Sequence, residues 1–453
     1  MNGNSPEKIK KVKNLIIGAG ITGLSTAFHL KDKNYLLIEK EKRPGGLCRS
    51  EKQGGFTYDY TGHLLHIKNE YVKKLIFKLL SGNIASRARN AAIYSNNVFT
   101  RYPFQANLYG LPQKIIAECI ESFIKSKLTT PYSLLPTPCF YDWCLQTFGE
   151  GISKYFMIPY NEKLWQTDTR ELTTRWMGRY VPQPSLEEVI RGAYNDNKKL
   201  FGYNANFYYP MRGGIQTLID GISKKVENIE TSVNVKSIDI KKKIVLTDKG
   251  VYGYKNLVST IPLPVLVSLI KNLPADVKKS AWKLKWTSVL DINIGISRAE
   301  TAGRHWIYFP ENKYVFYRVG YYNNFSKGLC PKNTFSMYVE VAYPPDSPAR
   351  QLSGERRAGI DGKTNKENVF KKAVSDLKKA GILKSNDKII SKCLLDIPYA
   401  YVVYDKNKEP AFEKISGFLK KHSVRTTGRY GGWKYSTMED AILEGMETAK
   451  LLK

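Results

Sequence analysis

Residues 12–40 read VKNLIIGAGITGLSTAFHLKDKNYLLIEK, and this stretch decides the fold. An apolar run, a GxGxxG pattern and a helical stretch are followed by a second apolar run that ends at Glu39. This order predicts a strand, a helix and a strand, the unit with which dinucleotide-binding folds begin. Gly18 permits the tight turn, and Gly20 lets the backbone approach a pyrophosphate. Gly23 lets helix and strand pack closely, and Glu39 is placed to accept from ribose hydroxyls.

A second glycine turn, RPGGLCRS at residues 43–50, follows directly. Flavin enzymes use such a turn, so it favours FAD over other dinucleotides. Arg43 and Arg49 are candidates to meet the pyrophosphate. Gly45 and Gly46 would let the backbone come near the ribityl chain.

The C-terminal stretch GRYGGWKYSTMEDAILEGME (428–447) predicts a helix. Ser436 and Thr437 are N-cap candidates, with Glu439 and Asp440 at capping-box spacing. A helix N-terminus that points at the flavin would favour the negative charge that develops on flavin reduction. Taken alone, the pattern is equally typical of an ordinary terminal helix.

The composition describes a globular protein of 453 residues with a formal net charge of +30. Its lysines are dispersed rather than gathered beside a nucleic-acid-binding module, so we expect no nucleic-acid partner. The charge suits an anionic substrate or peripheral membrane association. No window is apolar enough for a transmembrane segment, and the six cysteines show neither a disulfide framework nor a zinc-site spacing. We therefore expect a cytoplasmic protein without a metal.

The predicted fold class is α/β, with a Rossmann-like FAD-binding domain, a helical insertion and a second, mostly antiparallel sheet domain. Helical spacing of apolar residues marks 111–127, with 141–156 as a second helix, and alternating segments mark strands at 306–309, 315–322 and 335–343. We expect a disordered tail at 1–10, a discontinuous FAD-binding domain from 11–100, 205–265 and 410–453, a helical insertion at 101–204, and a sheet domain at 266–409.

The chain resembles the flavin-dependent UDP-galactopyranose mutases, especially the eukaryotic-type branch and its bacterial relatives. The resemblance runs from about residue 12 to 449 and rests on motifs that stand in order. The wider amine oxidase and protoporphyrinogen oxidase superfamily shares the first two and the last of them. The motifs are GAGITGL, PGGLCRS, YDYTGHLLH (58–66), RYPFQANLYGLP (101–112), YFMIPYNEKLW (155–165), YPMRGG (209–214), FYRVGYYNNFS (316–326), DIPYAYVVYD (396–405) and GRYGGWKYS (428–436).

The resemblance implies a role for individual residues. His63 matches the histidine beside the isoalloxazine, Arg318 an arginine on the substrate diphosphate, and Arg429 the arginine near flavin and sugar. The implied catalytic residues are therefore His63, Arg318 and Arg429. The implied substrate-binding residues around the uracil and the diphosphate are Tyr102, Phe104, Gln105, Asn161, Trp165, Arg179, Tyr180, Arg318, Tyr399 and Tyr435. The implied cofactor-binding residues are Gly18, Gly20, Gly23, Glu39, Gly45, Gly46, Leu47, Arg49, Gly62, His63, Arg429, Asp440 and Ala441.

The chain departs from the family pattern at two positions that bear on the substrate. The family has a second diphosphate-binding arginine four residues after a tryptophan, whereas WMGRYV here puts Tyr180 at that place and Arg179 one residue earlier. A further tyrosine of the phosphate cluster is replaced by Phe325. These departures leave open which nucleotide sugar is bound.

The resemblance implies a mutase that interconverts the pyranose and furanose forms of a nucleotide sugar, with UDP-galactopyranose as the first choice. In that chemistry N5 of reduced FAD attacks the anomeric carbon, and NAD(P)H or another reductant supplies the electrons. The alternatives are the same chemistry on another nucleotide sugar, an FAD-dependent oxidase of amines or protoporphyrinogen, and a non-enzymatic basic flavoprotein. The sequence leaves the oligomeric state open.

Overall fold

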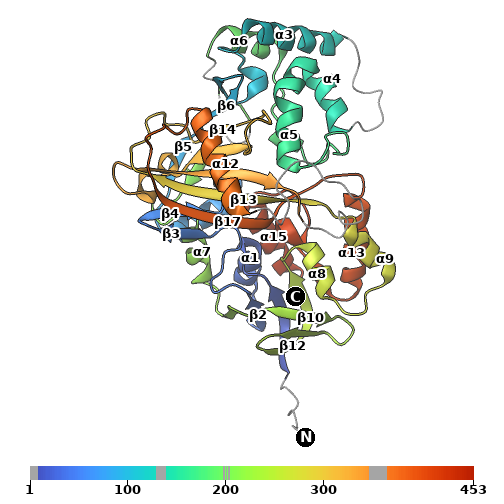
Figure 1. Cartoon of the computed structure of the whole chain (residues 1–453). Helices are drawn as coiled ribbons and strands as arrows, with labels where there is room; N and C mark the ends of the chain where they lie inside the picture. The colour runs from blue at the N-terminus through green and yellow to red at the C-terminus, as the bar shows by residue number, and fades with distance from the viewer. Residues whose placement is uncertain are drawn as a thin grey trace.

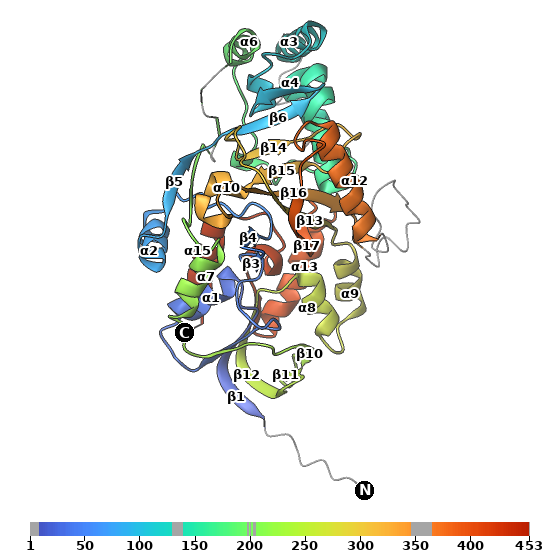
Figure 2. The ribbon, with the colours of Figure 1, turned by 60° about the vertical axis from the view of Figure 1, so that its left-hand side comes forward.

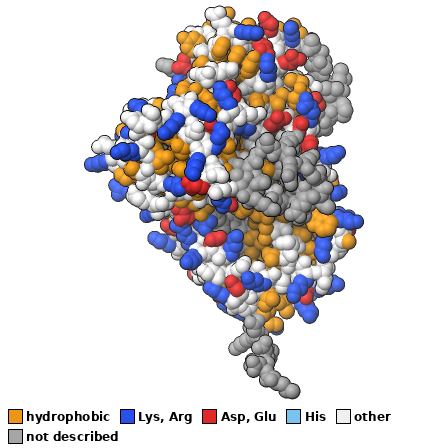
Figure 3. All heavy atoms as spheres, in the orientation of Figure 1, with side chains coloured by type: hydrophobic (Ala, Val, Ile, Leu, Met, Phe, Trp, Pro, Cys, Tyr) orange, Lys and Arg blue, Asp and Glu red, His pale blue; other side chains and the backbone are white. Residues whose placement is uncertain are grey.

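The computed structural model describes residues 9–128, 139–196, 199, 201–202, 205–345 and 365–452. Most of the tail expected at residues 1–10 therefore lies outside the described residues. Strand β1 already begins at Lys10. None of the described helices is both long and apolar enough to cross a membrane. In Figure 3, lysine and arginine side chains are spread over the whole face in view rather than gathered on one element.

A seven-stranded sheet forms the lower half of the molecule in Figure 1, in the order β10-β11-β12-β1-β2-β9 with β18 beside β12. Its centre is parallel, because β1 pairs with both β2 and β12 in the same direction. Helix α1 (Ile21–His29) connects β1 to β2, so the predicted strand–helix–strand start is observed. The strands are β1 (Lys10–Ile17), β2 (Tyr35–Ile38), β9 (Ile229–Glu230), β10 (Val235–Asp239), β11 (Ile244–Thr247), β12 (Gly250–Ser259) and β18 (Val424–Thr426).

Helices cover both faces of this first sheet, as Figure 2 shows. One buried apolar cluster joins the sheet to α1 and its neighbours, and another joins it to α8, α9 and α13. Strands that are buried on both faces read as continuous apolar runs, which explains the sequences LLI and LII. The first group also contains α2 (Glu70–Leu80), α7 (Gln216–Ser223) and α15 (Met438–Lys450), and the second consists of α8 (Leu263–Leu269), α9 (Ala275–Trp282) and α13 (Lys408–Lys421).

A second seven-stranded sheet lies above the first, in the order β17-β13-β16-β15-β14-β6-β7. All its neighbours are antiparallel except β6 and β14, as the prediction of a mostly antiparallel sheet requires. Helix α12 (Lys366–Lys379) packs on one face. The strands are β6 (Ala91–Ser95), β7 (Val98–Arg101), β13 (Trp286–Ile296), β14 (Trp306–Tyr308), β15 (Arg318–Tyr321), β16 (Phe335–Tyr343) and β17 (Ile389–Val402).

The expected domain division and the strand pairing differ at one place. Residues 91–100 are grouped above with the FAD-binding domain and Arg101 with the helical insertion, but together they form β6, β7 and the turn between them in the second sheet, because Ala91, Ala92 and Ile93 pair with β14. That pairing is long-range and leaves no mark in the local sequence.

The helical insertion lies at the top of Figure 1. It contains α3 (Gln113–Leu128), α4 (Phe140–Ile152), a π-helical turn at Ser153–Met157, α5 (Ile158–Trp165) and α6 (Leu186–Tyr194), with short 3-10 turns at Phe104–Ala106 and Gly178–Tyr180. Both helices expected from the sequence are present as α3 and α4. The remaining elements are β3 (Ser50–Gln53), β4 (Phe56–Asp59), β5 (Ala85–Ala88), β8 (Asn206–Tyr209), α10 (Tyr322–Phe325), a 3-10 turn at Lys327–Leu329 and α14 (Gly428–Gly431).

Candidate active site

A cavity of about 800 Å³ lies between the first sheet, the second sheet and the helical insertion. Its walls come from both glycine turns, the loop after β4, helix α5, strands β14 to β17 and the segment that leads into α15. The sequence-predicted residues that line it are Gly18, Gly20, Glu39, Gly45, Gly46, Leu47, Arg49, Gly62, His63, Tyr102, Gln105, Asn161, Tyr180, Arg318, Tyr399, Arg429, Tyr435 and Ala441.

The first glycine turn joins β1 to α1, and at Gly23 the backbone atoms pack too closely to admit additional side-chain atoms. Gly18 has φ +98°, a conformation that side chains other than glycine rarely adopt. A Cβ added at Gly23 would lie 1.9 Å from the Gly18 carbonyl oxygen, so Gly23 serves close packing and does not itself line the cavity. The N-cap residue Gly20 carries no side-chain cap, which leaves first-turn amides of α1 available to a phosphate.

Glu39 directly follows β2 and lines this part of the cavity. Its Oε2 accepts the Ala19 N–H at 2.7 Å and its Oε1 accepts the Glu41 N–H at 3.0 Å. Both bonds fix the carboxylate at the mouth of the glycine turn and still leave it lone pairs for a ribose.

The second glycine turn lies directly against the first, since the Gly45 N–H donates to the Ala19 carbonyl at 2.9 Å. Arg49 lines the cavity and donates through Nε to the Gly46 carbonyl at 2.9 Å. Arg43 turns away. It pairs with Glu51 at 2.5 Å and lines a separate cavity, so it does not meet the pyrophosphate position as the sequence suggested.

His63 follows a loop held in a restricted conformation. Thr61 has φ +71°, unusual for a β-branched residue, and its N–H donates to the buried carboxylate of Asp291 at 2.9 Å. The Nδ1 atom of His63 is buried and has no hydrogen-bond partner among the described residues. Burial, together with the nearby charges of Arg429 and Arg318, lowers the pKa of His63 to about 4. The imidazole is therefore neutral at pH 7 and presents an unpaired polar atom beside the cavity.

Arg318 begins β15 and lies on the cavity wall opposite the glycine turns. It forms a bidentate ion pair with Glu340, through Nε and, at 2.7 Å, through Nη2. Glu340 is completely buried, whereas the Arg318 side chain is 20% exposed. The guanidinium therefore keeps one exposed edge for an anion in the cavity.

Arg429 and Tyr435 lie side by side in the cavity wall. Arg429 donates to the Ser436 carbonyl at 2.9 Å and the Ala400 carbonyl at 3.1 Å, and its guanidinium lies 4.8 Å from the ring centre of Tyr435. The ring of Tyr180 meets Tyr435 edge-on, with 4.8 Å between centroids. Tyr180 thus lines the cavity through aromatic packing, whereas the side chain of Arg179 lies outside the described residues.

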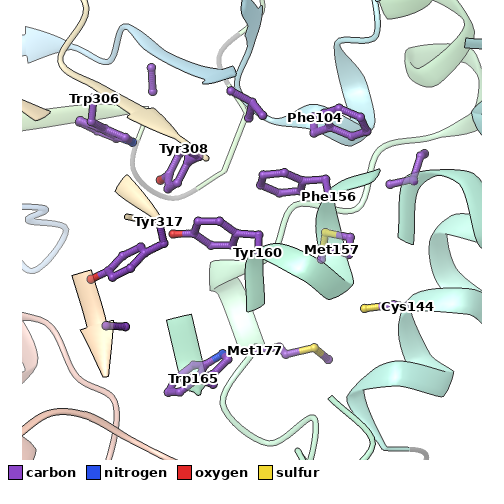
Figure 4. Close-up of a cluster of buried hydrophobic side chains, with 14 of the residues drawn as sticks. Phe104, Cys144, Phe156, Met157, Tyr160, Trp165, Met177, Trp306, Tyr308 and Tyr317 are labelled. Atoms are coloured by element: carbon purple, nitrogen blue, oxygen red, sulfur yellow. The ribbon is translucent and has the colours of Figure 1, made fainter. Parts of the chain in front are cut away.

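An aromatic wall closes the end of the cavity nearest the helical insertion (Figure 4). Phe156 stacks on Tyr160 with centroids 5.3 Å apart, and Tyr160 meets Tyr308 edge-on at the same separation. Phe104 stacks behind Phe156 and is fully buried, so it supports the wall without lining the cavity.

Two amides provide polar groups in this wall. Gln105 donates through Nε2 to the Pro182 carbonyl at 2.7 Å, and its Oε1 is buried without a partner in the part of the chain that the structure describes. Asn161 donates to the Met157 carbonyl at 2.7 Å and accepts the indole N–H of Trp165 at 3.1 Å. Trp165 does not line the cavity, and its observed function is to orient Asn161.

Helix α15 starts at the cavity, and Thr437 rather than Ser436 is its N-cap. Asp440 closes the capping box by accepting the Thr437 N–H at 2.8 Å. It does not line the cavity, whereas Met438 and Ala441 do.

Sequence reasoning missed much of the second sheet's contribution to the cavity. Its cavity-lining residues include Trp306, Tyr308, Tyr317, Tyr338, Asp396 and Tyr401. The available signal was the unusual density of tyrosine in the segments 315–322 and 335–343. Tyrosine is also common in strands, so its density alone predicts a strand and not a cavity wall.

The fold and the cavity define a dinucleotide-binding flavoprotein of the Rossmann type. Residues 170–452 match the family model of the flavin containing amine oxidoreductases, and residues 16–79 match an NAD(P)-binding Rossmann-like domain. The chain belongs to the flavin containing amine oxidoreductase family.

Among solved structures, a reduced UDP-galactopyranose mutase is similar over 97% of this chain and 93% of its own, with a TM-score of 0.88 and 26% identity. This confirms the resemblance indicated by the motifs. A putative protoporphyrinogen oxidase from Exiguobacterium sp. 255-15 shares the fold, with a TM-score of 0.71 and 14% identity over 98% of this chain and 99% of its own.

A coproporphyrinogen III oxidase of Staphylococcus aureus (strain NCTC 8325 / PS 47) is 25% identical over 253 residues, which are 50% of this chain and 52% of that protein. The chain thus spans between half and three fifths of the length of the curated relatives it matches.

Proposed function

We propose that the chain is a flavin-dependent mutase that interconverts the pyranose and furanose forms of a nucleotide sugar, with UDP-galactose as the first substrate to test. The observation that carries this proposal is the composition of one continuous cavity. It joins a dinucleotide turn at one end to Arg318, several tyrosines and an aromatic wall at the other. An oxidase of small amines has no need for a second nucleotide-sized compartment with an arginine in its wall.

The residues present fit FAD. Both glycine turns, Glu39 and the uncapped start of α1 would hold its adenosine and pyrophosphate, because a Cβ at Gly46 would lie within 3.3 Å of Gly20 Cα. His63, with its orphaned Nδ1, would lie beside the ring system. When bound and reduced, FAD supplies the electron-rich nucleophile for the sugar, so no side-chain nucleophile is required.

The chain's own residues bind the nucleotide and compensate charge. The aromatic wall around Tyr160 and Tyr308 suits the faces of a base, and the unpaired Oε1 of Gln105 suits a base N–H. The exposed edge of Arg318 would neutralise a diphosphate as it leaves the sugar, and Tyr399 and Tyr435 would donate hydroxyls to its oxygens.

The experiment that tests the proposal uses the purified yellow protein and UDP-galactose. After reduction with dithionite, we expect a second sugar nucleotide of equal mass to appear on anion-exchange chromatography. The oxidised protein should form none of this product. A panel of other nucleotide sugars then identifies the preferred pyranose. Turnover that consumes oxygen or NAD(P)H in proportion to product would contradict the mutase proposal.

An oxidase of porphyrinogens is the second candidate, favoured by the similarity of half the chain to a coproporphyrinogen III oxidase. Oxygen consumption with coproporphyrinogen or protoporphyrinogen, and none with UDP-galactose, would support it. The two candidates require opposite results for oxygen uptake.

A further inference from the structure

Lys163 lies in the last turn of α5 and donates to three backbone carbonyls of one loop. Its Nζ is 2.9 Å from the Phe309 oxygen, 3.0 Å from the Glu311 oxygen and 2.7 Å from the Phe316 oxygen. An ammonium has three N–H groups, so these bonds use all of them. The carbonyls belong to the segment between β14 and β15.

The two elements that Lys163 joins carry two different parts of the candidate nucleotide site. Helix α5 carries Tyr160 and Asn161 in the aromatic wall. The loop leads from Tyr308, at the end of β14, to Arg318, at the start of β15. Figure 4 shows Tyr160 between Tyr308 and Tyr317, the residues that flank this loop.

The same loop is held from its other side by α12. Asp376 is fully buried and accepts the Val315 N–H at 3.0 Å, while Lys372 pairs with it at 2.5 Å. With one anchor on each side, the loop has little freedom, and removal of one anchor alters where β15 begins. No carboxylate is paired with Lys163 within salt-bridge distance among the described residues, so its contacts are directed at backbone position rather than at charge compensation.

We propose that Lys163 is a positioning residue that fixes the distance between the base-binding wall on α5 and the diphosphate-binding Arg318. This inference rests on the proposed function, because it assumes a ligand that contacts both the wall and Arg318. The affinity of a ligand that contacts only the wall does not depend on this distance. The affinity of a ligand that also contacts Arg318 does depend on it.

The test compares uridine with UDP, since uridine has a base for the wall but no phosphate for Arg318, whereas UDP has both. The variant is Lys163→Met, which keeps the length of the side chain and removes its donors. Lys154→Met is the matched control, because Lys154 lies in the same helical segment and pairs with Glu118 on the outer surface at 2.7 Å. Dissociation constants are measured by titration calorimetry on the FAD-loaded protein.

We expect the preference for UDP over uridine to fall about tenfold in Lys163→Met and to stay unchanged in Lys154→Met. Lys163→Arg, which retains donors, should recover part of the preference. An equal loss of affinity for both ligands would indicate general loosening and overturn the inference, as would an unchanged preference. A wild-type protein that binds neither ligand would instead contradict the proposed function.

A second measurement needs no variant that might fail to fold. Burial lowers the pKa of Lys163 to about 7, against the opposing charges of Asp376 and Glu311. The other charged groups around the loop include Lys372 and Lys379, which pair with Asp376, and Lys313, which pairs with Glu311. Above pH 7 the neutral amine has two N–H groups for three carbonyls. The wild-type preference for UDP-glucose, whose diphosphate diester keeps a constant charge, over uridine should therefore fall between pH 6 and pH 8.5. A preference that is constant over this range would contradict the positioning function.

Discussion

Arg318 and Glu340 face each other across the antiparallel pair β15–β16, and Glu340 occupies two of the three guanidinium nitrogens. Asp291 on β13 lies opposite Glu340 on its other side. Burial, followed by the charge of Glu340, raises the pKa of Asp291 well above its usual range. Glu340 thus holds Arg318 from one side, and the guanidinium keeps its remaining edge for an arriving diphosphate, with Arg429 as a second cation in the wall of the same cavity.

Replacement of Arg318 by alanine should cost about 3 to 5 kcal/mol of transition-state stabilisation, measured as kcat/KM with the nucleotide sugar. The variant loses the cation and leaves Glu340 buried without its partner. Arg298→Ala is the matched control, because Arg298 forms a similar pair with the buried Asp387, at 2.7 Å, outside the cavity. The control should lose stability without losing nucleotide affinity. An Arg318→Ala enzyme of normal kcat/KM would remove Arg318 from the diphosphate site.

His63 should remain neutral through the physiological range. Because its pKa of about 4 lies below the ordinary 6.5, the unfolded chain binds a proton between these values that the folded chain does not. The free energy of unfolding therefore rises with pH from 4 to 6.5, by up to about 3 kcal/mol. This contribution to the free energy of unfolding is fully present above pH 6.5 and is lost as the pH falls toward 4.

Histidine-labelled NMR spectra should accordingly show a His63 ring that does not titrate above pH 5, assigned by its absence in His63→Phe. The variant's free energy of unfolding should rise less steeply over the same interval. A His63 midpoint near 6.5 would show that the burial and the two arginines do not act on the ring as the structure indicates.

The start of the fold was predictable because its determinants are local. A glycine turn between two apolar runs specifies β1, α1 and β2 through neighbouring residues alone, and the Thr437–Asp440 capping box specifies the start of α15 in the same way. By contrast, the pairing of β6 with β14 joins residues more than 200 positions apart. Hydrophobic periodicity contains no information about such a partner.

The residues of the candidate site also divide into those predicted from local sequence and those brought together only by long-range strand pairing. Glu39 and the glycines were placed by spacing, whereas Glu340 and Asp291 lie beside Arg318 only through the register of three strands. The roles expected for Phe104 and Trp165 came from resemblance, and both lie one layer behind the cavity. A sequence motif indicates that a side chain lies near a site. It does not show whether that side chain lines the cavity or packs behind a residue that does.

Gly23→Ala should abolish retention of the flavin. The added Cβ would lie 1.9 Å from the Gly18 oxygen, so α1 would have to move away from β1 and carry its N-terminal amides with it. We expect a loss of about 1 to 3 kcal/mol in unfolding free energy and a colourless preparation after gel filtration. Gly417→Ala is the control, because no atom lies within 4 Å of its Cβ position on the exposed side of α13. A yellow Gly23→Ala protein with normal stability would contradict the close packing of this turn.

Variants of Tyr180 test whether a tyrosine in place of the family's second diphosphate-binding arginine changes the substrate. Its ring packs edge-on against Tyr435 in the cavity wall and supplies no charge, so Tyr180→Ala should weaken turnover less than tenfold, far less than Arg318→Ala. Arg179→Ala provides the comparison. If that variant loses as much kcat/KM as Arg318→Ala, the neighbouring arginine reaches the diphosphate and the substrate need not differ. If Tyr180→Arg instead raises the affinity for UDP-galactose while lowering it for the preferred substrate, the aromatic residue is what sets the choice of nucleotide sugar.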